Sequence, residues 1–192
     1  MPVLDRFDLT GRTAVVTGST RGLGRAFAKA LAEAGANIVI VGRNASAAAE
    51  VEAELAPLAG DTLVVLADVT RRPDIERLLA ESVERFGRVD VLVNNAGACI
   101  HKPALEVTDD EWREVMGVNL DGLWIASQVF GGHMIDAGGG TIVNVGSMSG
   151  AIVNRPQWQP AYNASKAAVH HLTRSLAAEW APLGIRAISV LM

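Results

Sequence analysis

The 192-residue sequence predicts a single doubly wound α/β domain built on a parallel sheet. Short, almost wholly apolar runs alternate along the chain with longer amphipathic stretches. Continuous apolar runs are typical of strands buried on both faces, as in a parallel sheet that is covered by helices. Because no repeat, low-complexity tract or linker interrupts the alternation, we expect residues 1–192 to form one domain.

The apolar runs are expected to be strands because they are short and rich in Val, Ile and Leu. They span residues 13–17, 37–41, 62–66, 89–93, 140–145 and 185–191. The amphipathic stretches are expected to be helices over residues 22–34, 45–58, 71–86, 109–137 and 160–181. Glycines stand where these helices should stop, at positions 35, 60, 87, 138–140 and 184.

Two helices carry more detailed predictions. In the first, an apolar stripe at helical spacing is expected from Leu23, Phe27, Ala30 and Leu31. In the fourth, Thr108 stands before three acidic residues, which is typical of an N-cap followed by an acidic first turn.

Composition and charge exclude several classes of protein. A net charge of −4 offers no basic surface for nucleic acid. The single cysteine, Cys99, excludes an internal disulfide and fits a reducing compartment. The first residues have no signal-peptide pattern, and no apolar run reaches the roughly 18–20 residues of a membrane span. We therefore expect a soluble cytoplasmic protein. No metal is expected, since ligand spacing is lacking among His101, His133, His170 and His171.

A glycine-rich loop follows the first strand and opens the first helix. Glycine allows a tight turn and a close approach to a ligand, and a helix N-terminus offers free N–H groups. The spacing Gly-x-x-x-Gly-x-Gly is related to the dinucleotide fingerprint, and no Gly-Lys-[Ser/Thr] closes it as in a Walker loop. The loop is therefore predicted to hold a diphosphate through Gly18, Ser19, Thr20, Arg21, Gly22, Leu23 and Gly24.

The end of the second strand favours NADP(H) over NAD(H). NAD-binding domains place an acidic residue there to hold the ribose 2′-hydroxyl. Here the position carries Arg43, which together with Arg21 is expected to clamp a 2′-phosphate. The alternative is that both arginines are merely solvated.

After the third strand, Asp68 is expected to accept a hydrogen bond from the adenine amino group, and a helix cap is its alternative role. Val69 beside it is expected to line the cofactor site.

Tyr162 and Lys166 stand four residues apart, so on a helix they share one face. A neighbouring ammonium favours phenolate and lowers the pKa of a tyrosine, which makes Tyr162 a candidate general acid/base. For the pair alone, a solvated helix face is the alternative.

Four motifs in this order resemble the short-chain dehydrogenase/reductase family of the Tyr-x-x-x-Lys type over residues 8–190. They are the glycine loop, Asn94-Asn95-Ala96-Gly97 after the fourth strand, Ser147 after the fifth strand, and the Tyr162–Lys166 pair. The resemblance implies a Rossmann fold with strand order 3-2-1-4-5-6. It also implies NAD(P)-dependent hydride transfer between a secondary alcohol and a ketone.

The resemblance further implies roles for individual residues. Tyr162 would exchange a proton with the substrate oxygen, and Lys166 would lower its pKa and bind the nicotinamide ribose. Ser147 would hold the substrate oxygen and Asn119 would order a water in the proton relay. The centre of the cofactor pocket would be lined by Asn94, Ala96 and Gly97. Ser149 lies 13 residues before Tyr162, a gap common in the family, and is the alternative to Ser147, which we prefer because it matches the family's Gly-Ser at the end of the strand.

Residues 147–157 resemble the branch of the family that includes gluconate 5-dehydrogenases and sorbose or mannitol reductases. Polar side chains that would face a sugar hydroxyl or carboxylate are Asn154, Arg155 and Gln157, although a surface loop explains them as well. The alternative substrate is a 3-oxoacyl thioester, as in the acyl-carrier-protein reductases.

Relatives of this kind continue past the sixth strand into a Pro-Gly turn, a substrate lid and a seventh strand. The resemblance therefore implies that a chain ending at Met192 is C-terminally truncated. A second hypothesis follows, namely an inactive fragment that binds nucleotide without turning it over. The retained helices 109–137 and 160–181 are expected to form the interface of a homodimer.

Overall fold

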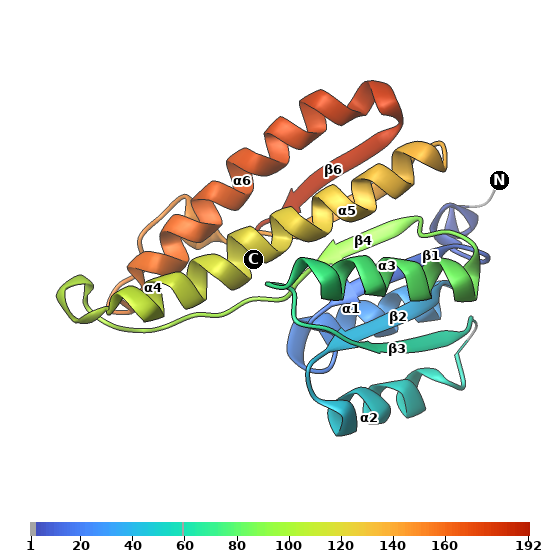
Figure 1. Ribbon diagram of the computed structural model, residues 1–192, viewed down its shortest axis with the longest axis horizontal. Coiled ribbons are helices and arrows are strands. Elements are labelled where there is room, and N and C mark those ends of the chain that lie inside the picture. The colour runs from blue at the N-terminus through green and yellow to red at the C-terminus, as the bar shows by residue number, and fades with distance from the viewer. Residues whose placement is uncertain (1–2, 59) are drawn as a thin grey trace.

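Six parallel strands form one sheet in the order β3-β2-β1-β4-β5-β6 in the computed structural model, which describes residues 3–58 and 60–192 (Figure 1). The predicted fold class and the predicted strand order are confirmed. Positions 1, 2 and 59 of the predicted domain lie outside the described residues. Within the described part of the chain, no helix combines the length and the apolar character that crossing a bilayer requires.

The strands lie close to their predicted positions. They are β1 (Thr13–Thr17), β2 (Asn37–Gly42), β3 (Thr62–Leu66), β4 (Val91–Asn94), β5 (Gly140–Val145) and β6 (Ile185–Val190). The prediction for β4 began too early, at residue 89. The N–H of Val89 donates to Nε2 of His133 at 3.1 Å rather than to a neighbouring strand, so pairing begins later.

The helices are α1 (Gly22–Glu33), α2 (Ala45–Leu55), α3 (Arg72–Phe86), α4 (Asp109–Met116), α5 (Gly122–Asp136) and α6 (Pro160–Trp180). The single helix predicted over 109–137 is therefore wrong in one respect: a π-helical turn, Gly117–Asp121, separates α4 from α5. The predicted N-cap is confirmed, because Thr108 and Glu111 form a capping box at the start of α4.

The predicted apolar stripe on α1 is wrong. The buried residues of this helix are its smallest ones, Gly24, Ala28 and Ala32. Small side chains let α1 lie close to the sheet, whereas Leu23 remains 55% exposed. Phe27 and Leu31 are only partly buried at the edge of the core.

Two apolar layers cover the two faces of the sheet. One layer joins the sheet to α3, α5 and α6 through large side chains such as Ile75, Phe130 and Trp180. The other joins it to α1 and α2 and is built mostly of alanine, valine and isoleucine. Because both faces are covered, the carboxyl ends of the strands are where the sheet remains open to a ligand.

Candidate active site

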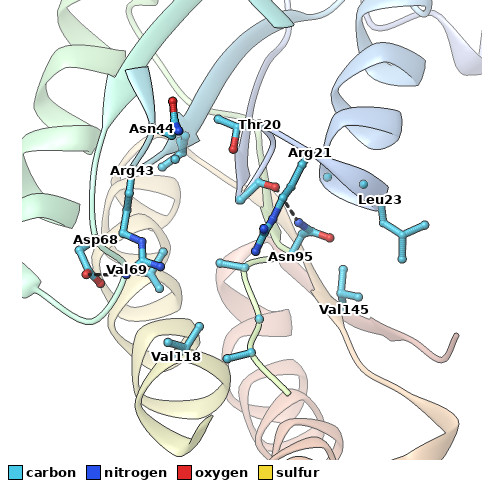
Figure 2. Close-up of a pocket in the computed structure, with 18 of the residues that line it drawn as sticks. Thr20, Arg21, Leu23, Arg43, Asn44, Asp68, Val69, Asn95, Val118 and Val145 are labelled. Atoms are coloured by element: carbon cyan, nitrogen blue, oxygen red, sulfur yellow. Dashed lines mark hydrogen bonds and ion pairs between the residues drawn. The ribbon is translucent and has the colours of Figure 1, made fainter. Parts of the chain in front are cut away.

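A cavity of about 670 Å³ opens at the carboxyl ends of the strands. It lies where the order of the strands reverses, since β1 pairs with β2 on one side and with β4 on the other. Crevices at such switch points are the usual ligand sites of open α/β sheets. Figure 2 shows the cavity between Arg43 and Asp68 on one side and Leu23 and Val145 on the other.

The glycine loop makes one wall of this cavity, and its glycines are required by its geometry. Gly18 and Gly22 have positive φ values of 66° and 55°, which L side chains rarely adopt. A Cβ on Gly24 would lie 2.3 Å from the carbonyl oxygen of Gly18, so only glycine fits there. No side chain of the described residues caps the N-terminus of α1, so its first N–H groups stay available to a ligand.

Two hydrogen-bonded side chains hold the loop against the end of β4. The hydroxyl oxygen of Thr17 accepts from the N–H groups of Asn95 and Ala96 at 3.0 and 3.1 Å. The side-chain amide of Asn95 donates to the carbonyl oxygens of Thr17 and Gly18 at 2.9 and 3.2 Å. We name these contacts the Thr17–Asn95 link. Asn95 lines the cavity, and the sequence analysis did not assign it a role.

Asn94 does not line the cavity. It is 4% exposed, and its amide donates to Oγ of Ser127 and to Oδ1 of Asn144 at 3.0 and 2.9 Å. The Asn144 amide in turn donates to Oγ1 of Thr173 at 2.9 Å. Successive residues of an extended chain point to opposite sides, so Asn94 joins β4 and β5 to α5 and α6 while Asn95 faces the cavity.

Ser19, also predicted to bind the cofactor, is fully buried beneath the loop. Its hydroxyl accepts from the N–H of Val41 at 2.9 Å, and its own N–H donates to the Val41 carbonyl at 3.0 Å. Ser19 therefore fastens the glycine loop to β2. The remaining predicted cofactor residues all line the cavity, namely Gly18, Thr20, Arg21, Gly22, Leu23, Gly24, Arg43, Asp68, Val69, Ala96, Gly97, Tyr162 and Lys166.

Positive charge gathers at one end of the cavity. Arg43 is largely exposed and pairs with Asp68 across 3.6 Å, while Arg21 extends over the cavity and forms no ion pair within the described residues (Figure 2). Asp68 accepts from the N–H and the hydroxyl of Thr70 at 3.0 and 2.7 Å, so it caps the turn that precedes α3. Burial raises the pKa of Asp68, but the hydrogen bonds from Thr70 and the charge of Arg43 outweigh it and leave that pKa below its usual value.

Tyr162 and Lys166 lie at the other end. Lys166 is 4% exposed; its Nζ donates to the Val145 carbonyl at 2.7 Å and lies 5.5 Å from the centre of the Tyr162 ring. Burial lowers the pKa of Lys166 to about 8, and the interaction with Cys99 opposes that shift. A buried ammonium beneath a phenol is the arrangement that the four-residue spacing predicts.

Neither candidate serine lines the cavity. The Ser147 hydroxyl donates to the Met192 carbonyl at 3.1 Å and accepts from the N–H of Ser149 at 3.2 Å. The Ser149 hydroxyl accepts from the amides of Asn154 and Gln159 at 3.1 and 3.2 Å. The Ser149 hydroxyl is therefore engaged within the segment that follows β5, whereas the Ser147 hydroxyl bonds both that segment and Met192 after β6.

Asn119 lies in the π-helical turn, is buried, and does not line the cavity. Its Oδ1 accepts from the N–H of Ala98 at 2.7 Å, and its Nδ2 donates to the Ala98 carbonyl and to Oγ of Ser165 at 2.9 and 3.0 Å. These contacts tie the segment after β4 to the helix that carries Tyr162. π-helical turns often mark functional sites.

Ten residues line the cavity without having been predicted, and most of them are small or apolar. The ten are Val41, Gly42, Asn44, Ala47, Ala67, Asn95, Ala98, Cys99, Val118 and Val145. Several of them end a strand or follow it directly. Position at a strand end was thus the one signal in the sequence that could have found them.

A second, smaller cavity of about 310 Å³ lies between the segment that follows β4 and the loop before α6. Its lining residues are His101, Lys102, Pro103, Pro156, Gln157 and Trp158. Cys99 lines the first cavity, and its sulfur lies 3.7 Å from Nε2 of His101, which lines the second; the Cys99 thiol also donates to the Gln159 side chain at 3.3 Å. The guanidinium of Arg155 lies 5.8 Å from the centre of the Trp158 ring.

The residues fit a dinucleotide. The cradle formed by Gly18, Gly22 and Gly24 admits a diphosphate at the N-terminus of α1, where side chains would block it. The cavity volume lies within the roughly 300–1,000 Å³ of cofactor and ligand pockets. Arginine side chains near the adenine-binding strands and a titratable pair elsewhere in the lining suit the two different ends of a nicotinamide dinucleotide.

Comparisons with known proteins agree with this geometry. Residues 12–192 match the family described as short chain dehydrogenase. The chain is 47% identical over 191 residues to a galactitol 2-dehydrogenase of Rhizobium johnstonii, covering 99% of this chain and 74% of that relative. It is 40% identical over 180 residues to the sorbose reductase sou1 of Schizosaccharomyces pombe, covering 92% of this chain and 70% of the relative.

Solved structures agree as well. A short-chain type dehydrogenase/reductase from Mycobacterium marinum superposes with a TM-score of 0.97 at 38% identity, covering 100% of this chain and 78% of that chain. A gluconate 5-dehydrogenase from Burkholderia cenocepacia, solved in complex with NADP and tartrate, superposes with a TM-score of 0.90 at 38% identity, covering 98% and 73%.

The two adjacent asparagines are expected to respond differently to substitution. Asn94→Ala should lower the free energy of unfolding by about 1–3 kcal/mol, because buried partners lose their hydrogen bonds, and should leave nucleotide affinity nearly unchanged. Asn95→Ala should weaken NADPH binding by roughly 5- to 100-fold, because two bonds to the glycine loop are lost. Urea denaturation and a fluorescence titration with NADPH measure the two effects. An equal loss of affinity in both variants would contradict the assignment.

Burial of Lys166 predicts a pH-dependent stability. The folded chain releases the Lys166 proton near pH 8 and the unfolded chain near 10.5, so unfolding takes up a proton between these values. The buried charge on Lys166 destabilises the folded chain, and this cost disappears as Lys166 loses its proton. The free energy of unfolding should therefore rise with pH in the window between these two values. Relative to Lys166→Met, the free energy of unfolding of the unmodified chain should rise by about 3 kcal/mol from neutral pH to above the window. Paired urea denaturation curves measure it, and a constant difference would contradict the burial.

Proposed function

Because this chain belongs to the short-chain dehydrogenase family of oxidoreductases that act on CH–OH groups, we propose that it interconverts a secondary alcohol and a ketone of a sugar, polyol or sugar acid with NADP(H). One observation carries the proposal. A dinucleotide cradle and the Tyr162–Lys166 pair line the same cavity, although about 140 residues of sequence separate them.

In this proposal Tyr162 is the general acid/base. The bound nicotinamide supplies or accepts the hydride. Tyr162 gives its phenolic proton to the carbonyl oxygen during reduction and takes it back during oxidation. With a pKa of about 8, Lys166 carries a positive charge at neutral pH, and that charge 5.5 Å from the ring favours the phenolate.

We assign the hydrogen bond to the substrate oxygen to Ser147. Ser147 lies two residues after the end of β5, in the turn next to Val145, whose carbonyl accepts from Lys166. Ser149, the alternative, already accepts from two side-chain amides, which supports a role in holding the loop. A hydroxyl donor on the oxygen stabilises the charge that develops there during hydride transfer.

Asn119 completes the proposed proton path through its backbone. Both N–H groups of its side chain are donated to Ala98 and Ser165, and its Oδ1 already accepts from the Ala98 N–H, so a relay water would bond the backbone carbonyl oxygen of Asn119 instead. A π-helical turn takes backbone carbonyls out of the regular α-helical pattern, which supports this role.

The charge at the far end of the cavity supports NADP(H) over NAD(H). Arg43 follows β2, where an acidic residue would hold a free ribose hydroxyl, and Arg21 extends over the middle of the cavity (Figure 2). A guanidinium binds phosphate oxygens in a fixed fork. The gluconate 5-dehydrogenase from Burkholderia cenocepacia contains NADP, which agrees with this preference.

The second cavity supports a polyhydroxylated substrate. Gln157 and His101 offer hydrogen-bonding groups there, and Trp158 offers an exposed ring. Arg155 lies over that ring and would suit a carboxylate at the distal end of a sugar acid. The relatives named for galactitol, sorbose and gluconate act on molecules of this kind.

We also propose a homodimer through the helices α4, α5 and α6. Trp112 on α4 is 42% exposed and Trp124 on α5 is 38% exposed. Exposed tryptophans are enriched at protein–protein interfaces, where one large ring buries much apolar area.

Turnover with three carbonyl compounds tests the proposed reaction. NADPH should be oxidised with 5-ketogluconate or fructose and not with an acetoacetyl thioester, since the second cavity offers polar groups to hydroxyls. Tyr162→Phe is the control and should abolish the reaction while it still binds NADPH. Turnover with the thioester alone would refute the sugar substrate, and NADPH binding without any turnover would indicate an inactive nucleotide-binding chain.

Substitution of Arg43 tests the choice of nucleotide. Arg43→Ala should weaken NADPH binding by roughly 10- to 100-fold, because a charge-assisted contact to the 2′-phosphate is lost, and should leave NADH binding unchanged. Arg77→Ala, on α3 and outside the cavity, is the matched control and should change neither affinity. Equal losses for both nucleotides in Arg43→Ala would refute a phosphate contact.

A further inference from the structure

The imidazole of His170 lies inside the turn that carries Ser147. A Cβ on Gly146 would lie 2.5 Å from Nε2 of His170, and a Cβ on Gly150 would lie 2.8 Å from its Cε1. The ring therefore occupies the space of two missing side chains, one on each side of the turn. Residues 146–150 enclose the imidazole more closely than any sequence without these glycines would allow.

The ring also makes a directed contact. The backbone N–H of Ser147 donates to Nε2 of His170 across 3.3 Å. Nε2 accepts only when it carries no proton, so this contact requires a neutral imidazole with its hydrogen on Nδ1. Burial, with the charges of Arg174 and Lys166, lowers the pKa of His170, which agrees with a neutral ring.

The position of His170 on α6 links this contact to the rest of the site. Tyr162, Lys166 and His170 follow one another at intervals of four residues, so they lie along one face of the helix. Lys166 bonds the carbonyl at the end of β5, and His170 bonds the N–H two residues later. One helix face thus determines where the turn lies relative to the Tyr162 ring.

We propose that His170 is a positioning residue for Ser147. Its neutral imidazole accepts the Ser147 N–H and holds the turn so that the Ser147 hydroxyl reaches the substrate oxygen. This inference rests on the role proposed above for Ser147. A purely space-filling role makes a different prediction, because a side chain of similar bulk without an acceptor would then be sufficient.

Two substitutions separate the two roles. His170→Leu keeps an apolar side chain but removes the acceptor, whereas His170→Gln keeps an acceptor oxygen at a similar distance from the backbone. His171→Leu is the matched control, because His171 is the adjacent histidine on α6 and is exposed. The measurements are hydrogen exchange of the Ser147 amide by NMR, kcat and KM for the ketone, and the Kd for NADPH.

In His170→Leu, the Ser147 amide should exchange at least about tenfold faster and kcat should fall at least about tenfold, with the Kd for NADPH unchanged. His170→Gln should restore most of the protection of the Ser147 amide and most of kcat. His171→Leu should behave as the unmodified chain. Ser147→Ala is the reference for the loss of kcat that follows when the hydroxyl itself is missing.

The inference is overturned if His170→Leu retains the exchange rate and kcat of the unmodified chain, or if His170→Gln falls as far as His170→Leu. Hydrogen exchange does not depend on turnover, so failure of the proposed reaction is recognised separately. A chain that reduces no ketone but shows the expected exchange pattern would refute the proposed function and support the contact between His170 and Ser147.

Discussion

The Thr17–Asn95 link is the contact on which the site depends. It joins the ends of β1 and β4, the two strands at which the chain reverses its direction of winding through the sheet. With the loop held at this point, Gly18 adopts a positive φ and α1 starts with its N–H groups directed at the cavity. A weaker join would leave the glycine loop free to close over the space that a diphosphate needs.

The second constraint comes from α6. Three side chains at four-residue intervals on this helix contact three different parts of the site: Tyr162 lines the cavity, Lys166 holds the end of β5, and His170 holds the turn after it. A helix of 21 residues is rigid over that length, so the distances among the three are not left to loops. The backbone of the turn that carries Ser147 is therefore held in place by side chains of a rigid helix.

Much of the fold follows from periodicity, because buried parallel strands must be apolar throughout and glycine must stand where φ is positive. Side-chain direction at the ends of strands is harder to predict. Asn94 and Asn95 are chemically identical neighbours, and only the register of β4 decides which one faces the cavity. Burial in the glycine loop is equally hard to predict from residue type. The polar Ser19 is buried by packing of the loop, whereas the apolar Leu23 on α1 is exposed. The π-helical turn at Asn119 had no signal in the amphipathic pattern.

An equilibrium titration of the unmodified chain with NADPH and with NADH, followed by nicotinamide fluorescence, is the most direct test of the proposed site. One nucleotide should bind per chain, NADPH should bind more tightly than NADH, and the bound NADPH should be oxidised when a polyhydroxylated ketone is added. Failure of both nucleotides to bind, in a chain shown to be folded, would contradict the proposed site.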